Sequence, residues 1–251
     1  MNRLVRLTDE QWQRVDPLLP PATKTGGRNA KPHRPMVEAM IWILRTGAPW
    51  RDLPAAYGPW HSVYTRFARW SQSGVLARML EALARERDGE GYLIDATIVR
   101  AHQDASGAAK KGGAKRLGVR AEVCLRRSTR GGDALGNPVK IGLTPGQTHE
   151  MKVAYELLGD ITNAYVAGDR AYDAGPLVEL LRQNGCTVVI PSNPTRASLR
   201  DYDRQLYRER CLVEHFFQRI KRFRRIAMRF DKLARNFLAF LQLAAALVWL
   251  L

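Results

Sequence analysis

The hydrophobic pattern of the chain changes near Gly89, and this change constrains the fold more than any other feature. Before it, apolar residues recur every three or four positions within the segments 36–46, 60–73 and 76–87, which predicts amphipathic helices. After it, short apolar runs that suit strands alternate with helical stretches. These runs are residues 92–100, 137–145, 163–169 and 186–192. We therefore expect a small all-α domain over residues 1–88 and an α/β domain over residues 89–251.

The all-α part has the order helix, Gly/Pro-rich turn, basic aromatic helix. The first of these helices ends at Gly47, and the second covers residues 60–73. One face of the second helix carries Trp60, Val63, Phe67 and Trp70, and another carries Arg66 and Arg69. Two interpretations stay open, a helix-turn-helix-like unit that contacts DNA and an ordinary helical bundle with a solvated basic face.

The charge balance favours a polyanionic partner. The chain has 40 Lys and Arg against 24 Asp and Glu, a formal net charge of +16. Nucleic acid is the first candidate for such a partner and an acidic membrane surface the second. The N-terminal residues have no apolar stretch of signal-peptide length, and the three widely spaced cysteines form no disulfide or zinc pattern. Both observations favour a cytoplasmic protein.

One segment looks membrane-like. Residues 237–251 read FLAFLQLAAALVWLL. A membrane-spanning helix needs roughly twenty apolar residues, and this segment is shorter and contains Gln242. We therefore expect a buried core helix and no membrane partner.

Two predicted strands carry an aspartate in an apolar setting. Asp95 lies within YLIDATIV, and Asp169 follows Gly168 at the end of a strand. Aspartate is disfavoured in strands, so its desolvation needs compensation. Either residue alone is better read as a turn cap or an arginine-paired acid, whereas the pair together suggests a shared cation.

A third acid lies on a predicted basic helix. Tyr207, Arg210, Glu214 and Lys221 fall on one narrow helical face, because their offsets are 0, 3, 7 and 14. Without the two aspartates, a solvated face with salt bridges would be the better interpretation.

With the aspartates, this spacing resembles the glutamate-region signature of bacterial insertion-sequence transposases of the DDE type. Further segments, in order along nearly the whole chain, are similar to compact members of the insertion-sequence-five family. They are LTDEQWQRVDPLLPP, GAPWRDLPAAYGPW, LIDATIVRAHQDASGAAK, DALGNPVKIGLTPGQTHE and RFDKLARNFLAFLQLAAALVWL.

The resemblance implies an RNase H-like catalytic domain, a mixed sheet flanked by helices, preceded by the helix-turn-helix-like domain. Its catalytic carboxylates would be Asp95, Asp169 and Glu214. They would bind two Mg²⁺ or Mn²⁺ ions roughly 4 Å apart, an arrangement suited to in-line phosphoryl transfer. The reaction would be nicking at the ends of the element, followed by attack of the freed 3′-hydroxyl on target DNA.

The same resemblance implies the DNA contacts and the assembly. Tyr207, Arg210 and Lys221 would contact phosphates and orient Glu214, while Arg66 and Arg69 would contact the terminal inverted repeats. Because two DNA ends are recognised together, we expect a homodimer or a larger synaptic complex at the nucleoid.

Three alternatives remain. The first is an RNase H-like nuclease that uses the same metal site without strand transfer. The second is a transposase remnant that binds DNA but no longer cleaves it. The third is a membrane-surface protein, which only the charge and the C-terminal helix favour.

Residues 114–131 depart from the family's pattern. Members typically carry Glu-Ala-Leu-Gly-Arg-Ser-Arg-Gly-Gly-Leu-Ser-Thr-Lys-Ile-His-Ala here, whereas this chain reads AKRLGVRAEVCLRRSTRGG. A set of synonymous codons can be chosen for Ala114 to Arg130 of this chain. The same nucleotides, read from the third base of the first codon, encode the whole family phrase. We hypothesise that the segment is translated out of the family's frame, which is regained before Asp133.

This departure bears on the second strand of the sheet, which the family phrase should form beside the Asp95 strand. The sequence AEVCLRRST keeps some β-compatible residues, but Arg126 and Arg127 stand where an apolar strand would continue. The segment forms either a strand with altered register or a loose basic loop. In both cases we expect lower stability around Asp95 and low activity.

Overall fold

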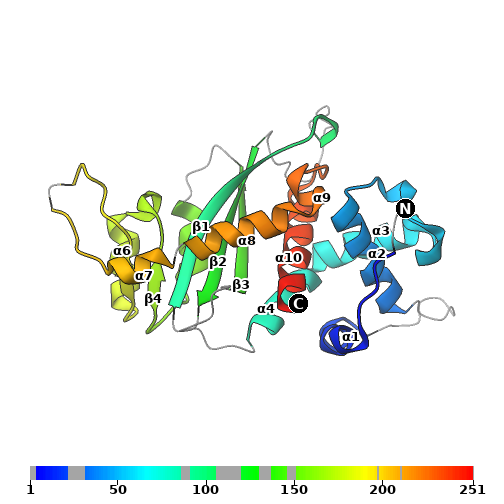
Figure 1. The fold of residues 1–251 in the computed structure, drawn as a ribbon, viewed down its shortest axis with the longest axis horizontal. Coiled ribbons are helices and arrows are strands. Elements are labelled where there is room, and N and C mark those ends of the chain that lie inside the picture. Colours follow the sequence, from blue (N-terminus) through cyan, green and yellow to red (C-terminus); the bar gives the residue numbers. More distant parts are fainter. Residues whose placement is uncertain are drawn as a thin grey trace.

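A mixed five-stranded sheet forms the centre of the molecule, with the N-terminal helices at one end and α6 and α7 at the other (Figure 1). The structure is a computed structural model. It describes residues 4–21, 32–85, 91–105, 120–129, 137–145, 151–196, 198–209 and 211–250.

The strand order of the sheet is β3-β2-β1-β4-β5. The first three strands form an antiparallel meander, and β4 and β5 continue the sheet parallel to β1. The strands are β1 (Gly91–Arg100), β2 (Arg120–Thr129), β3 (Asn137–Pro145), β4 (Tyr165–Ala167) and β5 (Thr187–Val189). This arrangement confirms the expected α/β, RNase H-like fold.

Helices cover both faces of the sheet. Residues of α5 (Met151–Leu158) and α6 (Gly175–Gln183) share a buried cluster with Ile94 and Val166. On the other face, Leu93 and Val99 belong to a larger cluster that includes α8 (Cys211–Lys221). The side chains of β1 thus alternate between two cores, and Asp95 belongs to the α8 face because it lies two residues from Leu93.

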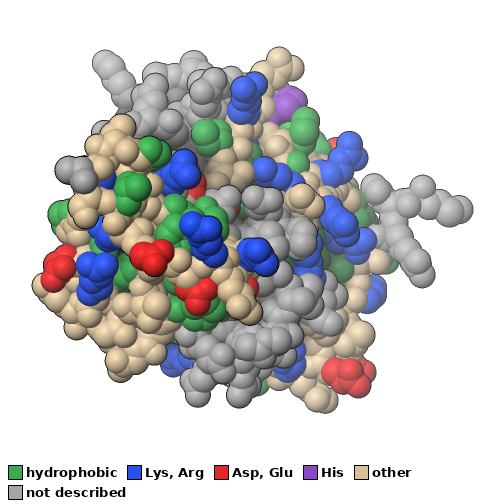
Figure 2. All heavy atoms as spheres, turned by 60° about the vertical axis from the view of Figure 1, so that its left-hand side comes forward, with side chains coloured by type: hydrophobic (Ala, Val, Ile, Leu, Met, Phe, Trp, Pro, Cys, Tyr) green, Lys and Arg blue, Asp and Glu red, His purple; other side chains and the backbone are tan. Residues whose placement is uncertain are grey.

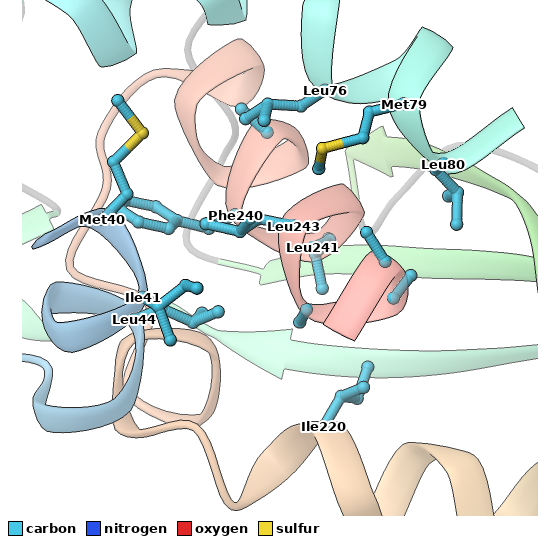
Figure 3. Packing of buried hydrophobic residues seen from close by; sticks show 14 of the residues in the cluster. Met40, Ile41, Leu44, Leu76, Met79, Leu80, Ile220, Phe240, Leu241 and Leu243 are labelled. Carbon is cyan, nitrogen blue, oxygen red and sulfur yellow. The ribbon is translucent and has the colours of Figure 1, made fainter. Parts of the chain in front are cut away.

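The apolar C-terminal segment forms α10 (Ala234–Leu250), which is buried almost all round. Figure 3 shows Phe240, Leu241 and Leu243 of this helix surrounded by side chains of α2, α4 and α8. Trp249 Nε1 donates to the carbonyl of Pro138 on β3 at 2.7 Å. No helix in the described ranges has the length and apolarity of a membrane span. The prediction of a buried core helix is confirmed.

The N-terminal helices pack around α10. They are α1 (Asp9–Val15), α2 (His33–Thr46), α3 (Trp60–Ser73) and α4 (Val75–Ala84). The buried residues of α2, α3 and α4 belong to the same cluster as those of α10. The connection from Gly47 to Pro59 contains two 3-10 turns, so it is longer than the roughly four-residue turn of a helix-turn-helix motif. The expected boundary at Gly89 lies outside the described residues.

The short helix α9 (Arg224–Ala227) joins α8 to α10 and also contacts the end of α2. Its Arg225 forms a bidentate pair with Asp231, with N–O distances of 2.8 and 2.9 Å, and also donates to the carbonyl of Ala48. Gly47 ends α2 at φ +69°, and a Cβ there would lie 3.1 Å from the Cβ of Arg224. The close approach of these two segments therefore depends on a glycine.

The atypical segment forms β2, a complete strand between β1 and β3, where two outcomes were open. Asp95 pairs with Leu125 across the ladder, and Leu93 pairs with Arg127. The β2–β3 register shifts between Arg126 and Arg127. Residues 114–119, 130 and 131 of the segment lie outside the described residues.

Candidate active site

Asp95 and Asp169 follow paired residues of two neighbouring strands. In the parallel β1–β4 ladder, Leu93 pairs with Ala167. Beyond Ala167 the chain stays extended, because the amide of Gly168 donates to Val189 of β5 and Asp169 has φ −79° and ψ 178°. The paired residues end there, but the same register continued by two residues would set Asp95 beside Asp169, at the spacing of about 4.8 Å that separates neighbouring strands.

Each of these carboxylates also binds a nearby backbone amide. Asp95 Oδ1 accepts from the amide of Ala96 at 2.9 Å, and Asp169 Oδ1 accepts from the amide of Ala171 at 2.9 Å. Asp169 thereby caps a 3-10 turn, as the turn-cap interpretation expected. These bonds hold one oxygen of each carboxylate toward its own backbone and fix the orientation of the group.

A contact between α8 and β1 brings the third candidate acid to the same region. Lys221 Nζ donates to Thr97 Oγ1 at 3.0 Å. Thr97 shares a face of β1 with Asp95, because the two residues are two positions apart. Glu214 lies seven residues before Lys221 on α8, so both belong to one side of the helix, which crosses β1 in Figure 1.

The structure describes only part of the predicted signature of Tyr207, Arg210, Glu214 and Lys221. The side chain of Glu214 and the whole of Arg210 lie outside the described part of the chain. Tyr207 is half-buried and lies on α7 (Arg204–Arg208), with its ring 5.3 Å from that of Tyr202. The prediction of one continuous helix from Tyr207 to Lys221 is therefore wrong, because α7 ends before α8 begins at Cys211. Among the described side chains no group of three His, Cys, Asp or Glu could hold a metal ion.

The two predicted arginines of α3 have different surroundings. Arg66 is half-buried, lies 2.5 Å from His33 Nδ1 and sits over the Trp70 ring. Burial lowers the pKa of the Arg66 guanidinium, and the positive charge of Arg69 lowers this pKa further. Arg69 is exposed. Only Arg69 has the exposure that a DNA contact needs without rearrangement.

Sequence reasoning missed an anchor four residues after Asp169. The side chain of Asp173 is fully buried, binds the guanidinium groups of Arg196 and Arg200, and accepts from the amide of Asn193 at 2.7 Å. It ties the segment after β5 to the turn that follows Asp169. The sequence GDRAYD contains this acid but gives no signal for partners about twenty residues away.

Two surface pockets adjoin α2. One has a volume of about 480 Å³, and the rings of Trp50, Trp60, Tyr64 and Phe230 help to line it. The other, of about 430 Å³, lies beside Arg45, Arg219, Arg222 and Arg224. On the α6 side of the molecule, by contrast, positive and acidic side chains are interspersed (Figure 2).

Comparisons with known proteins agree with these observations. Residues 7–80 match the family described as putative transposase of IS4/5 family, and residues 86–249 match the transposase DDE domain. An uncharacterized protein from Sinorhizobium fredii is 45% identical over 108 residues, which are 43% of this chain and 86% of the relative. A putative transposase for insertion sequence element IS6501 from Brucella ovis is 41% identical over 120 residues, which are 47% of this chain and 92% of the relative.

Among solved structures, a synaptic complex of piggyBac transposase with hairpin DNA is similar with a TM-score of 0.39 and 11% identity over 76% of this chain. The chain spans 50% of that piggyBac chain. A Mos1 transposase paired-end complex is similar with a TM-score of 0.27 and 10% identity, over 86% of this chain and 82% of the other. On the two family matches and the Brucella relative, this chain belongs to the DDE transposase family of insertion sequences.

Proposed function

We propose that the chain cleaves DNA at the terminal inverted repeats of its insertion sequence and joins the freed 3′-ends to target DNA, with Asp95, Asp169 and Glu214 as the catalytic carboxylates. One observation supports the proposal most. The β1–β4 register, continued by two residues, would set the first two acids side by side, and the Lys221–Thr97 contact holds α8, the helix that carries Glu214, against the same strand.

The donor set fits divalent cations. Three carboxylates supply the hard oxygen ligands that Mg²⁺ and Mn²⁺ prefer. Asp95 and Asp169 come from adjacent strands, and each already has one oxygen bound to its own backbone, which fixes the carboxylate. Two such ions, when bound, would activate the attacking oxygen and stabilise the leaving oxygen of an in-line phosphoryl transfer.

The other predicted residues would bind and orient the DNA. Lys221 would contact a backbone phosphate next to the carboxylates, since its ammonium group already lies at the Asp95 face of β1. Tyr207 and Arg210, which precede α8 in the sequence, would add phosphate contacts, and Arg69, with Arg66 behind it, would contact the terminal repeats. All of these contacts would form before the bond is cleaved, and they would determine which phosphodiester lies at the carboxylates.

The partners of the proposed reaction are duplex DNA and further copies of the chain. The piggyBac structure is a synaptic complex with hairpin DNA, and the Mos1 structure is a paired-end complex with a left transposon end. We propose a homodimer or larger assembly that holds two ends together, and a location at the bacterial nucleoid, where its substrate is.

The test is cleavage and joining of a duplex that carries the repeats flanking the gene, with Mg²⁺ or Mn²⁺. We expect Asp95→Asn, Asp169→Asn and Glu214→Gln each to lower the cleavage rate at least about a hundredfold and to leave repeat binding intact. The control is Asp160→Asn, an exposed acid at the end of α5. Pre-nicked ends separate the two enzyme classes, because a nuclease would not join them to a second duplex.

The assay also identifies the inactive alternative. Repeat binding with no metal-dependent cleavage by the unaltered chain would mean that this copy is a DNA-binding remnant. Cleavage that survives all three carboxylate substitutions would contradict the proposed site.

A further inference from the structure

Four arginines from different elements meet around one pocket. Arg45 lies on α2, Arg219 on α8, and Arg222 and Arg224 on the short stretch that leads into and begins α9. Phe223 and two residues of α10, Leu247 and Val248, complete the lining. The pocket of about 430 Å³ is therefore lined by four cationic and three apolar side chains, and it lies where α8, α9, α10 and α2 meet.

Among the described residues, these arginines lack the carboxylate partners that several other arginines of the protein have. Arg34 pairs with Glu38, Arg196 with Asp173, and Arg225 with Asp231. In the described part of the chain, by contrast, no ion pair with a carboxylate involves any of the four pocket arginines, and no lining residue is acidic. Gathering four positive charges without a counter-charge is unfavourable unless an anion completes the site.

The pocket lies on the other side of α8 from the candidate active site. Arg219 and Lys221 are two residues apart, so they point about 200° apart around the helix. Phe216 and Ile220 are buried between these two sides. Lys221 contacts β1, whereas Arg219 borders the pocket beside α10. A phosphate bound at Arg219 is therefore separate from a phosphate bound next to Lys221.

We propose that this arginine pocket is a second DNA site, which binds backbone phosphates of a duplex at a distance from the cleaved bond. The inference rests on the proposed function, because it takes DNA as the substrate. Arginine suits the role, since its guanidinium group donates two parallel hydrogen bonds to phosphate oxygens. The other lining side chains are apolar and offer no hydrogen bonds to base edges. The site would therefore recognise the phosphate backbone and not the base sequence.

The experiment measures the salt dependence of DNA binding by the full-length protein in EDTA, so that no chemistry at the carboxylates takes part. The probe is a fluorescent duplex of random sequence, titrated between 50 and 200 mM KCl as in standard salt series. The slope of log K against log salt decreases in magnitude by roughly 0.9 for each phosphate that the protein no longer neutralises. For Arg219→Gln with Arg222→Gln we expect a slope smaller by about 2 and binding weaker by roughly tenfold or more.

Two matched variants serve as controls. Arg85→Gln with Arg182→Gln removes the same charge from two exposed arginines that do not line the pocket, and should leave the slope nearly unchanged. Arg219→Lys with Arg222→Lys keeps the charge and should retain most of the slope. Thermal unfolding verifies that each variant is folded, which is expected because Arg222 is exposed and Arg219 half-buried.

An equal loss in both glutamine variants would overturn the proposal, since net charge alone would explain it. The proposal would also be overturned if the Arg219→Gln, Arg222→Gln variant bound a poly-glutamate peptide more weakly but bound DNA as before. That result would favour an acidic protein as the partner. Because binding is measured without metal, the experiment can contradict the proposed DNA site at the pocket without contradicting the proposed catalysis by the carboxylates. The reverse outcome, intact pocket binding without cleavage, would contradict the proposed activity alone.

Discussion

The Arg225–Asp231 pair is a residue-scale element of stability. Both side chains are buried, with 7% and 6% exposure, and the guanidinium also bonds to Ala48 at the end of α2. It lies over the rings of Phe230 and Phe240. A cation in these surroundings is tolerated only with its carboxylate, because desolvation of a lone charge is costly.

We therefore expect Asp231→Ala to lower the free energy of unfolding by about 3–5 kcal/mol, since it leaves Arg225 buried without a counter-charge. Denaturant unfolding followed by circular dichroism measures this. The comparison is Asp160→Ala, which removes an exposed acid 4.0 Å from Lys140 and should cost less than about 1 kcal/mol. Equal losses would show that the buried pair contributes no more than a surface one.

At this scale, the sequence predicted acids better than their partners. Asp95 and Asp169 stand out as candidates because aspartate is disfavoured in an apolar strand. Asp173 carries no such mark, because a turn tolerates aspartate, and its arginines follow about twenty residues later. Partners that only the tertiary fold brings together leave no local pattern.

At the scale of the element, strand β2 is where sequence and fold are least consistent. Position 127 pairs with Leu93, which is fully buried, and directly opposed residues of an antiparallel pair share a face. Placed from position 114 onward, the sixteen residues of the family phrase put its isoleucine at position 127. In that placement the family phrase has an apolar residue opposite Leu93, where this chain has an arginine.

Arg127→Ile is expected to raise the free energy of unfolding by about 1 kcal/mol, because a β-branched apolar residue suits a strand position opposite the buried Leu93 better than arginine does. Thermal unfolding should show a Tm higher by several degrees. Arg126→Lys is the matched control, since lysine is the family residue at that neighbouring position and keeps the charge.

A version of the chain with the whole family phrase should gain stability further and cleave faster. Equal activity of the restored and unaltered chains would refute the claim of impairment. The codons of the gene are a separate check on the reading-frame hypothesis, which fails if the shifted frame does not encode the phrase.

The periodicity predicted most helices and strands, but it gave one helix where the structure has two, α7 and α8. It also could not decide whether residues 120–129 form a strand. Their sequence suits a strand only weakly, and the pairing with β1 and β3 comes from neighbours on both sides. Tertiary context determines such a segment, because β-propensity depends on what lies alongside.

At the scale of the whole molecule, the two parts share one core. The apolar faces of α3 and α4 pack on α10, which follows the last strand, so a cut near residue 89 separates them in sequence but not in packing. The change of pattern near Gly89 predicted a change of architecture, and it could not reveal that the last helix returns to the first domain.

We expect the fragments 1–88 and 89–251, expressed alone, to lack cooperative unfolding, since each exposes a large apolar face. A full-length chain cut by a protease site inserted within residues 86–90 should stay associated on size-exclusion chromatography. Cooperative thermal unfolding of the 89–251 fragment would contradict the shared core.

The order of synthesis gives the central position of α10 a further consequence. Helices α2, α3 and α4 leave the ribosome first, but the helix around which they pack is made after every strand of the sheet. Until α10 has been synthesised, the apolar faces of the first helices in the nascent chain stay exposed to solvent. Such a state is prone to aggregation. A change of reading frame that was not repaired would remove α10 together with Glu214, so such a product would lose its core and its third carboxylate at once.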